Sequence, residues 1–290
     1  MKNFIHKIFN KSLISILALM SSAYPLFADA NHQHSTMDHT KHSHPGKQNY
    51  PSTLKLTVQK ILAKGGQQLV TIKLTDIQTN QPINLRDLNE VHTQKIHLLI
   101  IDDNLSDYTH THPQATNKAG VYQFTWQPTQ KNATYRIWAD LVPTKTNRQE
   151  YVISNLLSAP QNTLRSAHQL ARENTVDGYT FKLSFDQKQL KVGKPALGTI
   201  HITDTKGNPV RSLESVMGAY AHIVGFNDDF KTIVHIHPMG SEPQKSSDRG
   251  GPELQFHLVP EKAGFTKLYA QVKINGKELF VPFGIKIYKS

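Results

Sequence analysis

Short apolar runs with alternating polar positions recur over residues 52–290 and predict β-strands. Valine, isoleucine, threonine and aromatic residues dominate these runs, and glycine, proline or asparagine separates them, as between strands joined by turns. The runs are 54–58, 68–74, 96–100, 122–126, 135–141 and 151–156, then 179–185, 199–203, 220–226, 232–237, 254–258, 266–272 and 279–288. Roughly seven strands per half predict an all-β protein with two tandem immunoglobulin-like (cupredoxin-like) β-sandwich domains.

The two halves of the chain are copies of one pattern. TIKLTD at residues 71–76 corresponds to TIHITD at 199–204, and RIWADL at 136–141 corresponds to KLYAQV at 267–272. Because the similarity extends through each half, each half is expected to fold as one domain.

The first thirty residues have the pattern of a secretory signal peptide. Lys2, Lys7 and Lys11 precede an apolar stretch at residues 13–20, and the small residues at 28–30 supply a cleavage site. The apolar stretch is shorter than the roughly 20 residues that span a bilayer, so stable membrane insertion is not expected. This predicts a periplasmic or secreted protein.

The next segment is polar and rich in histidine, with Met37 among them: His32, His34, His39, His42 and His44. With almost no apolar residues it cannot build a core, so a disordered tail is expected. Several imidazoles on a mobile chain can collect copper, zinc or nickel; the alternative is a merely soluble linker. The expected segments are therefore a signal peptide at 1–30, a disordered His-rich tail at 31–51, a first sandwich at 52–158, a linker at 159–178 and a second sandwich at 179–290.

Composition narrows the chemistry. The 290 residues contain no cysteine, so disulfides and thiolate ligands are excluded and any metal site must use histidine, methionine or oxygen. The formal net charge is +11, but the lysines are scattered and no nucleic-acid motif is present, which indicates a solvated basic surface with no nucleic-acid partner.

One histidine motif, H-x12-H-x-H-P, occurs once in each half: His97, His110, His112 and Pro113, then His222, His235, His237 and Pro238. A symmetric hairpin with its turn at Asp103 and Asn104 would place His97 directly opposite His110. Opposed side chains have Cβ atoms about 4.5 to 5.5 Å apart, and period-two alternation brings the third histidine to the same face. The same argument applies to the second copy, so the motif predicts a metal site in each domain.

Alignment of the two copies adds further candidate ligands. His92 corresponds to Met217, Gln114 to Met239, and Thr125 to His257. On a regular strand His92 would face away from His97, so its inclusion requires a loop. The candidate sets are His97, His110, His112 and His92 in the first half, and His222, His235, His237, His257, Met217 and Met239 in the second.

Two simpler interpretations stay open at this point. Single histidines in sandwiches are commonly half-buried and bonded to carbonyls, and most methionines fill cores. Three histidines on one face, twice, favour metal binding. Imidazole shells suit zinc, copper(II) and nickel, and nearby thioether sulfur favours copper, so copper is expected ahead of zinc.

The hairpins IHLLIIDDNLSDYTHTHP and AHIVGFNDDFKTIVHIHP resemble exported bacterial immunoglobulin-like domains associated with copper handling, the YtkA-like group. GGPELQFH followed by AGFTKLYAQV is similar to the downstream half of that family, which supports His257 as a site residue. The first domain departs there, with Thr125 and Gln114 in place of the histidine and methionine. The resemblance implies exported metal binding and does not settle a reaction.

The sequence therefore predicts a copper-binding protein for storage, delivery or detoxification, with a metal transporter or acceptor protein as a partner and no catalysis. Signatures such as H-E-x-x-H or G-x-S-x-G are absent. The alternatives are a copper- or zinc-dependent oxidoreductase of the superoxide-dismuting kind and a structural or adhesion module without metal.

Overall fold

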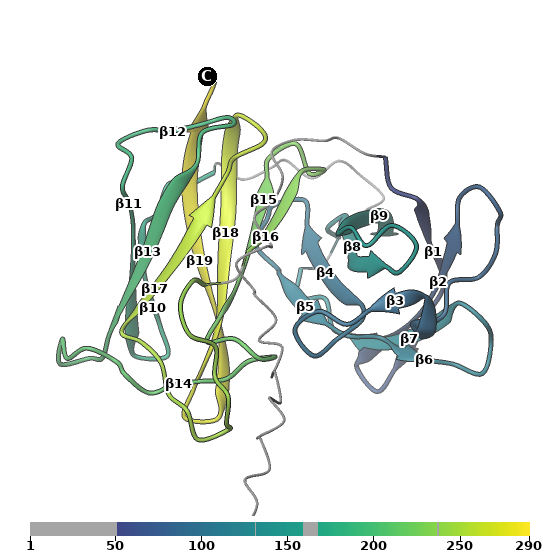
Figure 1. Ribbon diagram of the computed structural model, residues 1–290, viewed down its shortest axis with the longest axis horizontal. Helices are drawn as coiled ribbons and strands as arrows, with labels where there is room; N and C mark the ends of the chain where they lie inside the picture. The colour runs from purple at the N-terminus through teal and green to yellow at the C-terminus, as the bar shows by residue number, and fades with distance from the viewer. Residues whose placement is uncertain (1–50, 131, 159–167, 237) are drawn as a thin grey trace, which may run out of the picture. The chain divides into compact units, whose positions relative to one another are not determined.

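The computed structural model describes residues 51–130, 132–158, 168–236 and 238–290 (Figure 1). The predicted signal peptide and nearly all of the predicted His-rich tail lie outside the described residues, as do the first nine residues of the predicted linker. Residues Gly46–Ser290 form one compact unit. None of the helical segments among the described residues is long and apolar enough to cross a membrane.

The first repeat is a sandwich of two sheets, with strand orders β1-β2-β7-β6 and β3-β8-β4-β5, and with β9 also paired to β8. A short 3-10 helix, η2 (Leu85–Asp87), precedes β3. The strands are β1 (Leu54–Lys64), β2 (Gln67–Asp76), β3 (Leu88–Asn89), β4 (His97–Asp102), β5 (Thr109–Thr111), β6 (Gln114–Ala115), β7 (Val121–Trp126), β8 (Tyr135–Pro143) and β9 (Glu150–Leu157).

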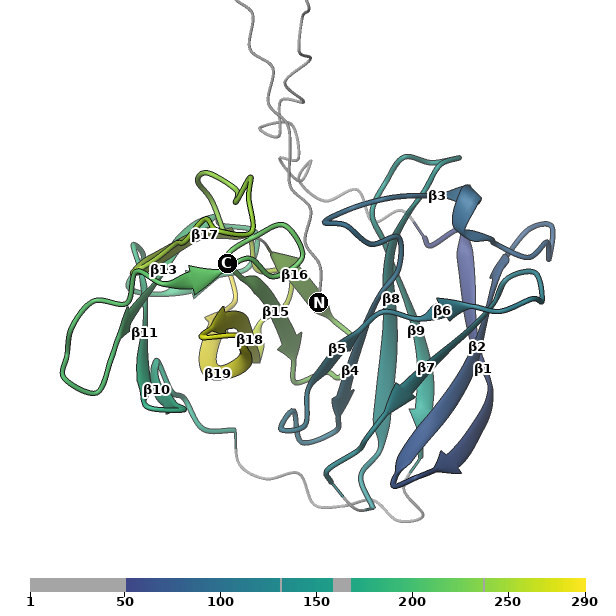
Figure 2. The same cartoon turned by 90° about the horizontal axis from the view of Figure 1, so that it is seen from below.

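The second repeat has the same plan, with sheet orders β10-β11-β13-β17 and β12-β19-β18-β15-β16 and with β14 paired to β18. Figure 1 shows β18 and β19 as long adjacent strands in this repeat, and Figure 2 shows the same pair nearly end-on. The strands are β10 (Glu173–Val176), β11 (Tyr179–Phe185), β12 (Leu190–Lys191), β13 (Ala196–Thr203), β14 (Leu213–Glu214), β15 (His222–Asn227), β16 (Ile233–Ile236), β17 (Glu253–Leu258), β18 (Gly264–Ile274) and β19 (Lys277–Tyr288).

The prediction of two tandem all-β sandwiches is confirmed, and the linker is shorter than expected. Residues Glu173–Val176, assigned to the linker from their polarity, form β10 and pair with β11. Their side chains alternate between exposed and half-buried positions. Because β10 lies at the edge of its sheet, its polar side chains can face solvent while its main chain pairs with β11.

Each sandwich has its own apolar core. The first core includes Ile72, Leu98 and Tyr135, and the second includes Phe181, Ile223 and Phe256, all with exposed fractions of 1% or less. Burial of one such side chain stabilises the fold by about 1.5 to 3 kcal/mol. Alternate residues of strands such as β13 supply this face, which is why period-two alternation predicted the strands.

Strands β4 and β15 are buried at every position, unlike an ordinary half-exposed strand. Leu98 and Ile100 face the core of the first sandwich, whereas Leu99 and Ile101 belong to a third apolar cluster that contains residues of both repeats. This shared cluster consists of Leu99, Ile101, Leu105, Tyr108, Trp138, Val224, Phe226, Phe230, Ile233, Phe265 and Tyr269. The near-continuous apolar runs HLLII and HIVGF are therefore explained by burial on both faces.

Reciprocal hydrogen bonds border the shared cluster. The Tyr269 hydroxyl donates to the carbonyl of Leu105 at 3.0 Å, and the Arg136 guanidinium donates to the carbonyl of Phe230. Leu105 and Phe230 occupy equivalent turn positions with φ of 55° and 56°. Each repeat thus satisfies a turn carbonyl of the other.

The predicted register of the histidine hairpins is wrong by two residues. His110 pairs with Leu99 instead of His97, and His235 pairs with Val224 instead of His222. The turn is centred one residue later than expected because Leu105 adopts a left-handed conformation, while Asp102 accepts hydrogen bonds from the main chain of Ser106. A shift by an even number keeps each side chain on the same face, so the predicted convergence does not depend on the error.

Candidate metal centre

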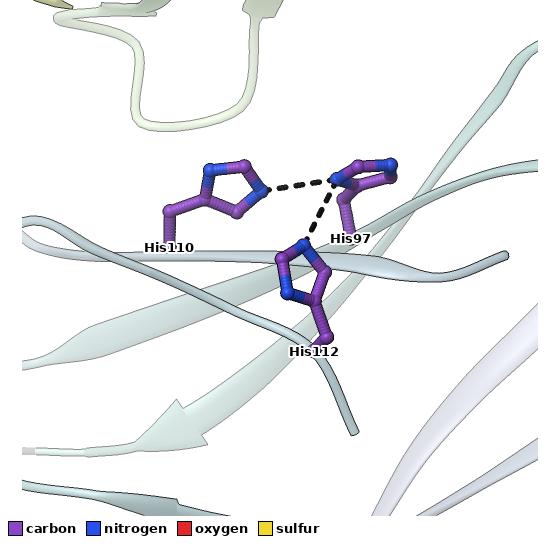
Figure 3. A group of neighbouring side chains, drawn as sticks. All are labelled: His97, His110 and His112. Atoms are coloured by element: carbon purple, nitrogen blue, oxygen red, sulfur yellow. Dashed lines mark hydrogen bonds between the residues drawn. The ribbon is translucent and has the colours of Figure 1, made fainter. Parts of the chain in front are cut away.

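Three histidines of the first repeat converge on one point. His97 begins β4, His110 lies in β5, and His112 follows that strand. His97 Nδ1 is 3.1 Å from His110 Nε2 and 3.2 Å from His112 Nε2 (Figure 3). One ring nitrogen from each residue lies within 4.8 Å of the other two, which is a spacing that a single metal ion can bridge.

The outer hydrogen bonds of His97 and His110 fix the tautomers of these two rings. His97 Nε2 is 3.0 Å from the carbonyl oxygen of Val91, which can only accept, so Nε2 carries the proton and Nδ1 has a lone pair. His110 Nδ1 is 2.8 Å from Gln271 Oε1. The Gln271 amide is oriented by its own donation to Glu278 Oε2 at 2.8 Å, so His110 Nδ1 donates and its Nε2 has the lone pair.

Two lone pairs therefore face each other across 3.1 Å, on His97 Nδ1 and His110 Nε2. A proton on His112 Nε2 can satisfy only one of them. A cation between the rings would be bound by both, and nitrogen atoms bonded at about 2.0 Å to one tetrahedral ion lie about 3.3 Å apart. The outer hydrogen bonds thus arrange the cluster for a shared positive charge.

Burial and mutual repulsion keep these imidazoles neutral. Burial lowers the pKa of His97 and lowers that of His110 well below its ordinary value, and for His110 the neighbouring imidazoles act in the same direction. Burial, and then the charge of His97, lowers the pKa of His112 to about 4. Neutral imidazole is the form that binds metal, so no proton has to leave at neutral pH.

The second repeat arranges His222 and His235 in the same way. His222 Nε2 is 2.9 Å from the carbonyl oxygen of Val216, the counterpart of Val91. His235 Nδ1 is 2.6 Å from Asp140 Oδ2, so it donates to the carboxylate, and in the neutral ring Nε2 has the lone pair. Burial lowers the pKa of His222 well below its ordinary value, and the charge of His235 lowers it further.

The structure brings the two predicted sites into one cluster. Within the second repeat the ring centroids of His222 and His235 are 5.6 Å apart. Between repeats, His235 is 5.7 Å from both His97 and His110, and His222 is 5.8 Å from His110. These spacings approach those within the first triad, so the two histidine sets are not independent sites.

His92 contributes to the cluster from a turn. His92 and Thr93 have φ of 48° and 66°, and Val91 pairs with Gln94 across them. This turn supplies the loop that the alternation argument required. The His92 ring lies 5.7 Å from that of His222, edge to face, so His92 is placed beside a histidine of the other repeat.

The methionines and His257 are placed differently. Met217, at φ 50°, occupies the matching turn of the second repeat and is half-buried. His257 lies on β17 with an exposed side chain, in the sheet that does not contain His222 and His235. Met239 is 49% exposed. His237 lies outside the described residues.

Sequence reasoning missed the residues that orient the histidines. Asp140 on β8 pairs with His97, and Gln271 on β18 pairs with His222 in the same register. Each nevertheless bonds a histidine of the opposite repeat, His235 and His110 respectively. The alignment of RIWADL with KLYAQV already marked the two positions as equivalent, but no sequence pattern indicates which strands face each other.

Asp140 is itself held in place and lies beside a small cavity. Gln149 Nε2 donates to both of its carboxylate oxygens, at 2.9 and 3.1 Å. The cavity has a volume of about 10 Å³, which is room for one water molecule or one ion, and its lining includes His92, His97, Asp140, Gln149 and His235.

The sequence profile of a family described as "Domain of unknown function (DUF8832)" matches the chain in two segments, residues 47–154 and 174–289. Together these segments cover more than half of the chain. The chain belongs to the DUF8832 family. The two DUF8832 segments correspond to the two sandwiches, which confirms the internal repeat. No curated protein matches this DUF8832 chain.

Solved structures resemble the DUF8832 chain only weakly. A β-glycosidase from Bacteroides vulgatus is 13% identical, with 81% of this chain and 25% of that chain covered and a TM-score of 0.21. Salmonella alpha-2-macroglobulin is 11% identical as a mutant and 10% identical after reaction with methylamine; 82% of this chain and 15% of that chain are covered in each, with TM-scores of 0.22 and 0.23. The chain spans a quarter or less of these proteins, and such low similarity says nothing about function.

Proposed function

We propose that this protein binds metal through the histidine cluster, with copper preferred over zinc, and that it stores, delivers or detoxifies that metal. The observation that carries the proposal is the pair of lone pairs on His97 Nδ1 and His110 Nε2, which face each other across 3.1 Å. Because Val91 and Gln271 fix both tautomers, a neutral cluster alone cannot satisfy both nitrogens.

Burial of several imidazoles also favours a ligand role. His97, His222 and His235 have exposed fractions of 3% or less. Burial of polar rings is unfavourable unless their nitrogen atoms have partners, and a metal ion supplies one partner for several rings at once. A metal centre therefore accounts for the cluster better than a structural role does.

The ligand chemistry favours copper ahead of zinc. The described ligands are imidazole nitrogens, which suit copper and zinc alike. Met217 lies in a turn equivalent to that of His92, and thioether sulfur favours copper, especially copper(I). The protein has no cysteine, so thiolate cannot compete for that role.

A location outside the cytoplasm and a partner belong to the same proposal. The signal-like first thirty residues, the His-rich segment after them and the resemblance to YtkA-like domains support an exported metal-handling protein. A metal transporter or acceptor protein would then receive the ion.

The test is metal content in a chain whose tail cannot bind. His32, His34, His39, His42 and His44 are replaced by Asn, the protein is purified without an affinity tag, and it is titrated with copper(I) and with Zn²⁺ against a chelator of known affinity. The additional substitution His110→Asn is expected to lower the copper(I) affinity by on the order of 100-fold, because one ligand and its outer hydrogen bond are lost.

His201→Asn is the matched control, because His201 lies on β13 in the other sheet and pairs with Glu253. It should leave affinity unchanged. If the tail-substituted protein binds neither copper nor zinc, or if His110→Asn binds copper(I) as tightly as the control, metal binding by the cluster is wrong.

A further inference from the structure

We propose that the histidine cluster holds two inequivalent cations: one between His222 and His235, backed by the carboxylate of Asp140, and one at His97, His110 and His112, backed by the neutral amide of Gln271. This inference rests on the proposed function and specifies its stoichiometry and selectivity. The Asp140-backed position would take a divalent cation, and the Gln271-backed position would take copper(I).

The two repeats exchange the hydrogen bonds that orient their histidines. Asp140 and Gln271 occupy equivalent positions, yet Asp140 of the first repeat bonds His235 of the second at 2.6 Å, and Gln271 of the second bonds His110 of the first at 2.8 Å. Such reciprocity is the arrangement of a self-complementary interface. Each repeat therefore orients a metal-binding ring of the other.

Asp140 carries a buried negative charge behind the second histidine set. A carboxylate that accepts a hydrogen bond from a metal-bound imidazole raises the basicity of that imidazole. It also offsets part of the charge of the ion. Asp140 has an exposed fraction of 3%, so water screens its charge little. This combination favours a 2+ ion at His222 and His235.

The position of Gln271 has the opposite character. Its amide oxygen fixes the His110 tautomer but contributes no net charge, and the carboxylate behind it, that of Glu278, belongs to an exposed residue. All three ligands of this triad are neutral, and the buried carboxylate near them, that of Asp140, bonds His235 and none of their rings, so a 2+ ion would be offset less here than at His222 and His235. A singly charged, soft ion such as copper(I) meets a smaller penalty there.

The two histidine sets lie close to each other. His97 and His222 have ring centroids 6.4 Å apart, and the other cross-repeat pairs lie at 5.7 to 5.8 Å. Two cations in such a cluster repel each other through a buried medium. Binding is therefore expected in two steps, with the Asp140-backed position filled first by Zn²⁺.

The experiment uses the full chain with the tail histidines replaced by Asn and titrates it with Zn²⁺ alone, then with copper(I) under anaerobic conditions. The expected result for the parent protein is one tight Zn²⁺ step, with a second position that takes copper(I). Asp140→Asn keeps the shape and one acceptor oxygen for His235, but it removes the charge and one of the two bonds from Gln149. It should weaken the tight Zn²⁺ step by about 10- to 100-fold and leave copper(I) binding unchanged.

The complementary variant, Gln271→Glu, is made together with Glu278→Gln. It adds a carboxylate behind His110 and keeps a hydrogen bond between positions 271 and 278 without two adjacent carboxylates. It should create a second tight Zn²⁺ step, and the pair Asp140→Asn with Gln271→Glu should restore one tight step. This rescue separates a charge effect from a loss of structure, since a merely structural Asp140 could not be replaced from the other repeat. Gln187→Glu, next to the exposed Asp186, is the control for charge alone.

The outcomes distinguish this inference from the proposed function. One ion in total, equal effects of Asp140→Asn on both steps, or failure of Gln271→Glu to add a Zn²⁺ step would overturn two inequivalent positions while metal binding stands. Absence of any bound metal in the parent protein would remove both.

Discussion

At the scale of single residues, the centre depends on which nitrogen of each ring carries the proton. The carbonyls of Val91 and Val216 hold the Nε2 protons of His97 and His222, which leaves Nδ1 as the ligand atom. His110 and His235 present Nε2 instead. Spacing in the sequence identified the histidines, but the choice of nitrogen depends on carbonyl and side-chain partners that only the fold brings near.

The lowered pKa values predict how stability depends on pH. The pKa of His112 is about 4 in the folded chain against an ordinary value of 6.5, so between these values the unfolded chain binds a proton that the folded chain does not. The free energy of unfolding of the metal-free protein should fall as pH decreases from about 6.5 to about 4, by on the order of 2 kcal/mol for His112. Urea unfolding at a series of pH values measures this.

His97, His110 and His222 contribute in the same direction, because burial lowers their pKa values too. His112→Gln should reduce the slope between pH 4 and 6.5. A free energy of unfolding that is flat or rises as pH falls through this window contradicts the assignment of neutral, buried rings.

At the scale of elements, the sequence predicted that the histidines share one face of the hairpin, but not which residues pair across it. Alternation placed the three histidines together, and the even shift preserved that result. The register itself depends on the turn, where Leu105 adopts φ 55° and is buried against the other repeat. A leucine at positive φ is unusual, and tertiary packing outweighs local preference there.

Strand β4 offers a matched pair of substitutions. Leu98 and Leu99 are adjacent and fully buried, but Leu98 faces the core of its own sandwich and Leu99 faces the shared cluster. Each change to Ala should lower the free energy of unfolding by about 2 to 5 kcal/mol. Only Leu99→Ala should also weaken metal binding, because it loosens the contact that sets the histidines of the two repeats together.

Chemical unfolding and a Zn²⁺ titration of both variants provide the measurement. Equal loss of Zn²⁺ affinity in Leu98→Ala and Leu99→Ala would show that general destabilisation, rather than contact between the repeats, governs the centre.

At the scale of the whole molecule, the sequence predicted two domains but not that their sites meet. The near-continuous apolar runs of β4 and β15 are typical of strands covered on both faces, and every residue of both strands is buried. They could not show that each strand covers the other repeat. His92, which alternation allowed in the first site only from a loop, lies in such a turn but beside His222 of the other repeat.

If the two repeats share one metal centre, bound metal should make them unfold together. Zn²⁺ at 100 times its dissociation constant should raise the free energy of unfolding by about 2.7 kcal/mol, in one transition that includes both sandwiches. Calorimetry with and without Zn²⁺ checks this, with His201→Asn expected to match the parent. Two separate transitions, only one of which moves with Zn²⁺, would be inconsistent with a shared centre.

The reciprocal bonds of Asp140 and Gln271 also bear on why the repeat occurs within one polypeptide. Two identical copies related by a symmetry axis must carry the same residue at this position, and so two carboxylates or two amides. Covalent fusion removes that constraint, because each copy can then change alone. A chain with two fused repeats can therefore have a carboxylate behind one histidine set and an amide behind the other, which no homodimer of a single copy could have.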